Sequence, residues 1–235
     1  MKNTDRAILL NRISYSESSL IVTYYTFENG IHKFIFQGGK KKAHQLFPLS
    51  LSEITYYKRP DSDLGKLTSA ESYQLLKEVP FNPIKSTIAF FIAEVLLKCL
   101  KTEESEKDLF LFLEEEIIRL DQFDNFTYFP ILFLIKFSHY LGIFPHKENN
   151  NCIYFNLMEG VFVQIKPAGD IYYTGESVEL ISSIISKINE PVLTLSTSKK
   201  VRENALQIMV QYYQLHVPQF KELNTFEVIK EILYS

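Results

Sequence analysis

The sequence predicts an α+β protein in which a small five-stranded β-barrel precedes an α-helical domain. Five short runs rich in β-branched and aromatic residues lie before residue 75. From Asn82-Pro83 onward, apolar residues recur at helical spacing instead. A closed barrel is favoured over an open sheet because closure removes exposed strand edges. The predicted domains are therefore residues 1–80 and 81–235.

Turn-forming residues separate the predicted strands. Asn29-Gly30 supplies the positive φ angles of a tight hairpin between the second and third strands. Gly38-Gly39 ends the third strand, and a turn at residues 60–63 precedes the fifth. The five strands are predicted at residues 6–13, 20–27, 31–37, 47–57 and 64–73.

The helical region begins with an explicit start signal. Asn82 is suited to cap a helix, and Pro83 fits its first turn. A small hairpin around Met158-Glu159-Gly160 interrupts the helices within an insertion at about residues 146–167. The helices are predicted near residues 83–99, 106–120, 130–141, 178–188, 199–215 and 225–233.

Composition argues against a membrane or disulfide-rich protein. The chain has 235 residues, and its most apolar stretches are interrupted by Glu94 and Lys136, so they fall short of the roughly 20 apolar residues that span a bilayer. The charged first six residues do not resemble a secretory signal. Cys99 and Cys152 are the two cysteines and lie far apart, which predicts neither a disulfide framework nor a zinc knuckle. We expect a cytoplasmic protein without a membrane partner.

Positive charge is concentrated at the N-terminal end. Residues 1–60 contain nine Lys and Arg against four Asp and Glu, whereas residues 61–160 contain nine against 16. Lysine and arginine side chains bind phosphates and release counterions. A cationic track for a sugar-phosphate chain is therefore predicted, although a solvated lysine loop would give the same run of charges. Its candidate DNA-binding residues are Arg6, Arg12, Lys33, Lys40, Lys41 and Lys42.

Two further groups of residues are candidates for binding. Six aromatic residues of the predicted strands could stack on bases; strict alternation would turn one of each adjacent Tyr pair outward. They are Tyr24, Tyr25, Phe34, Phe36, Tyr56 and Tyr57. Hydroxyl residues 196–198 precede Lys199, Lys200 and Arg202 at a predicted helix start, which suggests an anion or acidic-peptide site. A solvated helix start is the alternative.

No pattern in the sequence predicts catalysis or a metal site. His139, His146 and Cys152 are spaced unlike common metal ligands. Asp61 and Asp63 fit a turn by conformation alone. No nucleophile elbow, Walker loop or His-Glu-x-x-His motif occurs. We therefore expect neither an enzyme nor a cofactor.

Several segments in the same order resemble the RecO family of recombination mediators, over nearly the whole chain. The opening combines Arg6-Ala7-Ile8-Leu9-Leu10 with residues 15–22, a Gly30 hairpin and the basic loop Gly39-Lys40-Lys41-Lys42. Residues 140–145 resemble the Leu-Gly-x-x-Pro segment that precedes the family's zinc module. The ending resembles the family's last two helices at residues 212–216 and 223–226.

The resemblance implies an OB-fold barrel, a helical domain and a DNA repair role. That role would be to bind single- and double-stranded DNA, promote annealing and load recombinase onto strands coated by single-strand binding protein. RecR and the acidic tail of the single-strand binding protein would be partners, in the bacterial cytoplasm at the nucleoid. Many members carry four cysteines in the zinc module, whereas this chain has only Cys152 there, so we expect a degenerate, metal-free hairpin.

Three functions remain open, in decreasing order of support. The first is a DNA repair mediator. The second is a protein-binding adaptor whose OB barrel has no direct DNA role. The third is an enzyme with an unrecognised site, which would need a pocket with convergent titratable groups.

Overall fold

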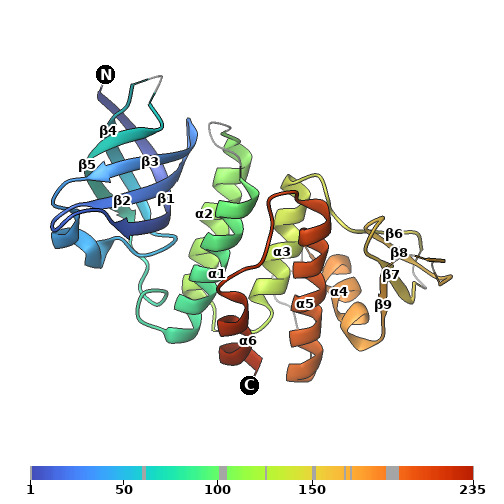
Figure 1. Cartoon of the computed structure of the whole chain (residues 1–235). Coiled ribbons are helices and arrows are strands. Elements are labelled where there is room, and N and C mark those ends of the chain that lie inside the picture. Colours follow the sequence, from blue (N-terminus) through green and yellow to red (C-terminus); the bar gives the residue numbers. More distant parts are fainter. Residues whose placement is uncertain are drawn as a thin grey trace. The chain divides into compact units, whose positions relative to one another are not determined.

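The computed structural model describes residues 2–59, 62–100, 105–124, 126–149, 152–166, 168–169, 171–188 and 196–234. The chain divides into two compact units, Met1–Asp124 and Asn125–Ser235. The elements of the first unit are coloured blue to green in Figure 1, and those of the second are yellow to red. Strands give way to helices between Gln74 and Pro83, but the predicted division after residue 80 stays a prediction.

The first unit contains a closed five-stranded barrel, which confirms the predicted fold class. Its neighbours are antiparallel except for one parallel pair, β3 with β5. Five strands closed in this order form the OB-fold arrangement. The strands are β1 (Lys2–Ser14), β2 (Leu20–Thr26), β3 (Gly30–Phe36), β4 (Leu51–Tyr57) and β5 (Leu64–Gln74), in the order β1-β2-β3-β5-β4.

Every second side chain of the strands points into the barrel and fills it, because successive side chains of a strand point to opposite faces. Phe34 and Tyr56 lie with ring centroids 4.7 Å apart, and Tyr24 lies 6.4 Å from Phe34. Gly65 allows β5 to approach this cluster, because an added Cβ would lie 2.7 Å from Phe34 Cδ1 and 3.0 Å from the Tyr57 carbonyl. The inward side chains include Ala7, Leu9, Val22, Tyr24, Phe34, Phe36, Ile54, Tyr56 and Leu67.

The connection from β3 to β4 corrects two sequence predictions. The basic segment expected to be a loop forms a short 3₁₀ helix, η1 (Gly39–Gln45), entered through Gly38 at φ 70°. The fourth strand begins at Leu51 rather than residue 47, because residues 47–50 form a turn in which the Ser50 amide donates to the Phe47 carbonyl. Leu49 adopts φ 65° in that turn.

Two helices complete the first unit. Asn82 caps α1 (Pro83–Cys99) as predicted, accepting hydrogen bonds from the Ile84 and Lys85 amides at 3.0 and 3.2 Å. The second helix, α2 (Lys107–Gln122), packs against the barrel, and its Phe110 ring lies 6.0 Å from that of Tyr25. The outer face of β2 is thus partly covered by protein.

In its described residues, the second unit contains four helices and a small sheet (Figure 1). The predicted hairpin forms from β7 (Tyr154–Asn156) and β8 (Val161–Val163), but β6 (His146–Lys147) and β9 (Tyr172–Thr174) extend it into a four-stranded sheet of order β6-β8-β7-β9. The helices are α3 (Phe129–Tyr140), α4 (Glu176–Ser186), α5 (Lys199–His216) and α6 (Phe226–Tyr234). In the described parts of the chain, no helix has the length and apolar character needed to cross a membrane.

Candidate nucleic-acid interface

Arg6 lies on the outer face of β1, where α2 engages it. Its guanidinium lies 3.5 Å from the Glu114 carboxylate and 4.5 Å from the ring centroid of Phe27. Tyr73 also donates a hydrogen bond to Glu114. The acidic face of α2 therefore supplies a partner for a cation that was predicted to contact DNA.

Three of the predicted cations gather where η1 meets the strands. The Arg12 guanidinium donates to the Ala43 carbonyl of η1. Lys40 and Lys41 are exposed on η1, and the Lys40 amide donates to Ser18 in the β1–β2 connection at 3.2 Å. The backbone of Lys42 continues η1, but its side chain lies outside the described part of the structure.

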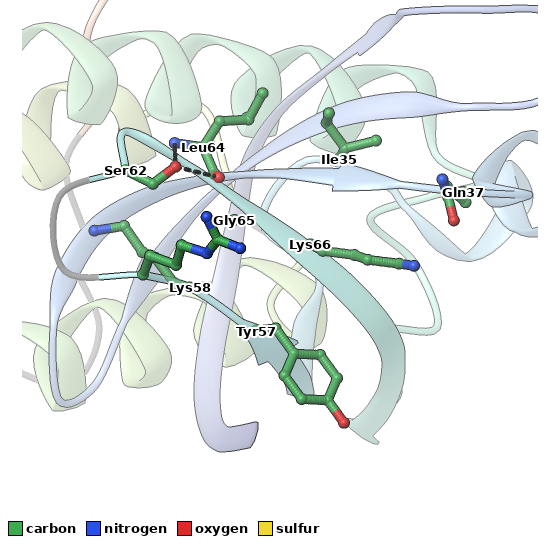
Figure 2. Close-up of a pocket in the computed structure, with 9 residues that line it drawn as sticks. Ile35, Gln37, Tyr57, Lys58, Ser62, Leu64, Gly65 and Lys66 are labelled. Carbon is green, nitrogen blue, oxygen red and sulfur yellow. Dashed lines mark hydrogen bonds between the residues drawn. The ribbon is translucent and has the colours of Figure 1, made fainter. Parts of the chain in front are cut away.

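Lys33 is exposed on the outer face of β3, beside a hollow in the barrel wall. It pairs in register with Leu64 of β5, which lines that hollow. The hollow has a volume of about 480 Å³ and lies over β3, β4, β5 and the β4–β5 connection (Figure 2). Its lining comprises Ile35, Gln37, Tyr57, Lys58, Arg59, Ser62, Leu64, Gly65 and Lys66.

Three cations that were not predicted as DNA contacts also line this hollow: Lys58, Arg59 and Lys66. Two of them, the adjacent Lys58-Arg59 pair directly after the fourth predicted strand, could have been recognised in the sequence as a basic pair next to a strand end. Lys66 was harder to identify, because its place opposite Tyr57 depends on the pairing of β4 with β5. Oligonucleotides bind OB folds on the face near strands 2 and 3 and on the loops joining strands 1–2 and 4–5. The hollow occupies part of that region.

On β2 the adjacent tyrosines point to opposite faces as predicted, but neither is exposed. Tyr24 and Tyr25 are both buried, because Tyr24 points into the barrel and Tyr25 packs on Phe110 outside it. Burial raises the pKa of the Tyr24 hydroxyl well above its ordinary value of 10.0. On β4 the alternation holds, since Tyr56 is buried and Tyr57 is 46% exposed.

The cations at the start of α5 mainly contact other residues of the protein. Ser198 caps the helix by accepting from the Val201 amide at 3.3 Å. Lys200 lies 2.9 Å from the Glu203 carboxylate. Arg202 stacks 5.4 Å from the ring centroid of Tyr128 and donates to the Thr197 carbonyl. Lys199 is exposed at the first position of the helix.

The described residues of the small sheet do not gather the donor set of a zinc site. Zinc sites in proteins take four ligands from Cys, His and carboxylates. Within the described residues no group of three or more such side chains is placed to hold a metal ion. The Cys152 thiol donates instead to the Asn149 and Phe162 carbonyls, each at 3.0 Å. The sheet packs through stacked Phe155 and Phe162, whose ring centroids lie 4.4 Å apart.

The barrel and its hollow define an OB-fold protein with a basic face. Family models described as "Recombination protein O N terminal" and "Recombination protein O C terminal" match residues 1–76 and 80–223. The chain is 34% identical to DNA repair protein RecO of Phocaeicola vulgatus, over 96% of each chain. It is 28% identical to DNA repair protein RecO of Christiangramia forsetii and of Bacteroides fragilis, over 97% and 96% of each chain. The chain therefore belongs to the RecO family of DNA repair proteins, which confirms the resemblance found in the sequence.

Proposed function

We propose that this protein is a non-enzymatic DNA repair and recombination mediator that binds single- and double-stranded DNA through the basic face of its barrel. It promotes annealing of strands and helps to load recombinase onto strands coated by single-strand binding protein. The hollow lined by Lys58, Arg59 and Lys66 is the observation that carries this proposal. Membership of a DNA repair family supports it.

The proposed DNA surface extends from the hollow along β3 to η1. Lys33 and Ile35 lie on one face of β3, and Gln37 leads into the lysines of η1. Arg6 is left out of this surface because Glu114 and Phe27 engage its guanidinium. Four phosphate contacts on a single strand, at a slope of about −0.7 each, lower the affinity roughly twentyfold for a threefold rise in salt.

The binding test is a fluorescence titration of labelled single- and double-stranded oligonucleotides at two salt concentrations. The variant Lys58→Glu/Arg59→Glu/Lys66→Glu reverses the charges around the hollow. It should therefore bind both kinds of oligonucleotide more weakly, and its affinity should depend less steeply on salt. Lys66→Glu is compared with Lys221→Glu, which reverses one exposed lysine of the second unit. Unchanged binding by the triple variant would contradict the proposal. Absence of DNA binding with retained capture of partner proteins would favour the adaptor function.

Partners are proposed from the family and from the cations of α5. We infer that RecR and the acidic tail of the single-strand binding protein bind this protein in the bacterial cytoplasm, at the nucleoid. Lys199, Lys200 and Arg202 would receive the tail, and Lys199 and Lys200 are exposed. Undiminished peptide binding by a triple alanine variant in calorimetry would reject that site.

The small sheet is proposed to fold without zinc. A lone Cys152, hydrogen bonded to two carbonyls, does not supply a tetrahedral thiolate set. Its stability would come from aromatic packing: Tyr212 of α5 lies 5.4 Å from Phe155, and its hydroxyl donates to the Ile143 carbonyl at 2.8 Å.

A further inference from the structure

The hollow on the barrel contains an exposed aromatic ring among its cations. We propose that Tyr57 is the residue on which a DNA base stacks, and that this contact favours single strands over duplex. This inference rests on the DNA binding proposed above and assigns one base-contacting residue within it.

Burial separates Tyr57 from the other five candidate aromatics. Tyr24, Phe34, Phe36 and Tyr56 belong to the barrel core, where no base can reach their faces. Tyr25 is 1% exposed and packs on Phe110 of α2. Tyr57 is 46% exposed and lines the hollow. The six aromatics predicted from the sequence thus reduce to one accessible ring.

The local structure fixes the outward direction of Tyr57. The preceding Tyr56 is held inside by Phe34 at 4.7 Å and by an Asn29 amide that donates to its hydroxyl at 3.3 Å. Neighbouring side chains of a strand point to opposite faces, so Tyr57 is directed outward. The pairing of β4 with β5 shifts register between Thr55 and Tyr56, and such irregularities commonly re-aim side chains near binding sites.

Strand register places a cation and an apolar side chain beside the ring. Tyr57 pairs with Lys66 of β5, and Lys66 pairs with Ile35 of β3. Directly paired residues have Cβ atoms about 5 Å apart, so these three side chains form one row across the outer face. Figure 2 shows Tyr57 and Lys66 extending from neighbouring strands of the hollow. A nucleotide stacked on Tyr57 would have its phosphates within reach of Lys66 and of Arg59.

This arrangement discriminates between the two forms of DNA. In a duplex both faces of each base are covered by its neighbours, so Tyr57 gains contact only after unstacking. In a single strand the base faces are available, and stacking on an aromatic side chain tolerates any sequence. The cations attract both forms, whereas Tyr57 adds affinity for single strands alone.

Phe81 provides a control for this ring. It is 81% exposed in the connection between β5 and α1, and it does not line the hollow. Tyr57→Phe is the conservative variant, because phenylalanine retains the stacking face and loses only the hydroxyl.

The test measures binding of the full-length protein to three labelled probes of about 12 nucleotides, a length within the site size of one OB fold. The probes are oligo-dT, an abasic strand of equal length and a duplex. Tyr57→Ala should weaken binding to oligo-dT by about 5- to 150-fold, the loss of one stacked base. Binding to the abasic strand and the duplex should stay unchanged, and Tyr57→Phe and Phe81→Ala should resemble the wild type with all three probes.

Separate outcomes overturn the inference and the proposed function. If the wild type binds DNA in a salt-sensitive manner but Tyr57→Ala retains full affinity for oligo-dT, stacking on Tyr57 is wrong while DNA binding stands. If Tyr57→Ala weakens binding to all three probes equally, the ring supports the barrel instead of contacting a base. If the wild type binds neither oligo-dT nor duplex, the proposed function fails and the inference with it.

Discussion

In the first unit, the hydrogen bonds accepted by the Asp121 carboxylate, at the end of α2, allow a quantitative test. It accepts hydrogen bonds from three successive backbone amides of the connection between β5 and α1, those of Lys77 at 2.9 Å and of Glu78 and Val79 at 2.8 Å. The Asp121 carbonyl also accepts from the buried Lys85 ammonium at 2.8 Å. Asp121 thereby links the connection between β5 and α1 to both helices of the first unit, α1 and α2.

The substitution Asp121→Asn should destabilise the protein. Oδ1 accepts the amides of Glu78 and Val79, and Asn retains that oxygen. Oδ2 accepts the Lys77 amide, and Asn places an NH₂ group there, so two donors face each other. Loss of one hydrogen bond to a charged group, plus a donor left unpaired in a buried site, costs about 2–4 kcal/mol. For a chain of this length that corresponds to a fall in Tm of about 4–16 °C.

Thermal unfolding followed by circular dichroism measures this loss, and hydrogen exchange of a peptide covering residues 75–82 locates it. Glu115→Gln is the control, because it makes the same carboxylate-to-amide change at an exposed position of α2. Exchange of the three amides should accelerate in Asp121→Asn and stay unchanged in the control. An Asn variant that melts with the wild type, with these amides still protected, would refute the role given to Asp121.

Two further predictions concern the barrel and the small sheet. Burial raises the pKa of Asp5 above its ordinary value of 3.8 despite hydrogen bonds from Glu28 and Asn29, so its contribution to stability falls as pH rises through that raised pKa. Asp5→Asn should therefore gain stability relative to the wild type between about pH 4 and pH 7 in urea unfolding, and a pH-independent difference would contradict this. For the small sheet, dialysis against a chelator should leave the melting curve unchanged, whereas Phe162→Ala should lower stability by about 3–5 kcal/mol; stoichiometric zinc in the purified protein would argue against a metal-free sheet.

Local signals in the sequence were enough to predict most elements. Asn82-Pro83 marked the start of α1, because capping and the fixed φ of proline are properties of adjacent residues. Asn29-Gly30 likewise marked the β2–β3 hairpin, and Gly30 adopts φ 73° there. The strands β6 and β9 were missed because each has two or three residues and is defined by its partner in the sheet. Strands as short as these contain too few residues to show the alternation of apolar and polar side chains that identifies a strand in a sequence.

The candidate site was harder to predict, because it depends on which strands become neighbours. Lys66 and Tyr57 come from different strands, and only the antiparallel register of β4 and β5 pairs them. The same limit applies to Tyr25, whose burial depends on Phe110, more than 80 residues later. Alternation along one strand specifies two faces, but it does not say whether another element covers the outer one.

Arg6 and Lys66 show how topology divides one cationic region between two roles. Both lie on barrel strands and are directed to the outer face, Arg6 from β1 and Lys66 from β5. Arg6 lies where α2 packs, and Glu114 from the acidic middle of the chain meets its guanidinium. Lys66 lies on β5 among the other cations of the hollow. The acidic region thus engages the cation of β1 in holding the unit together, whereas the proposed DNA surface uses the cations of β3, β5 and the β4–β5 connection.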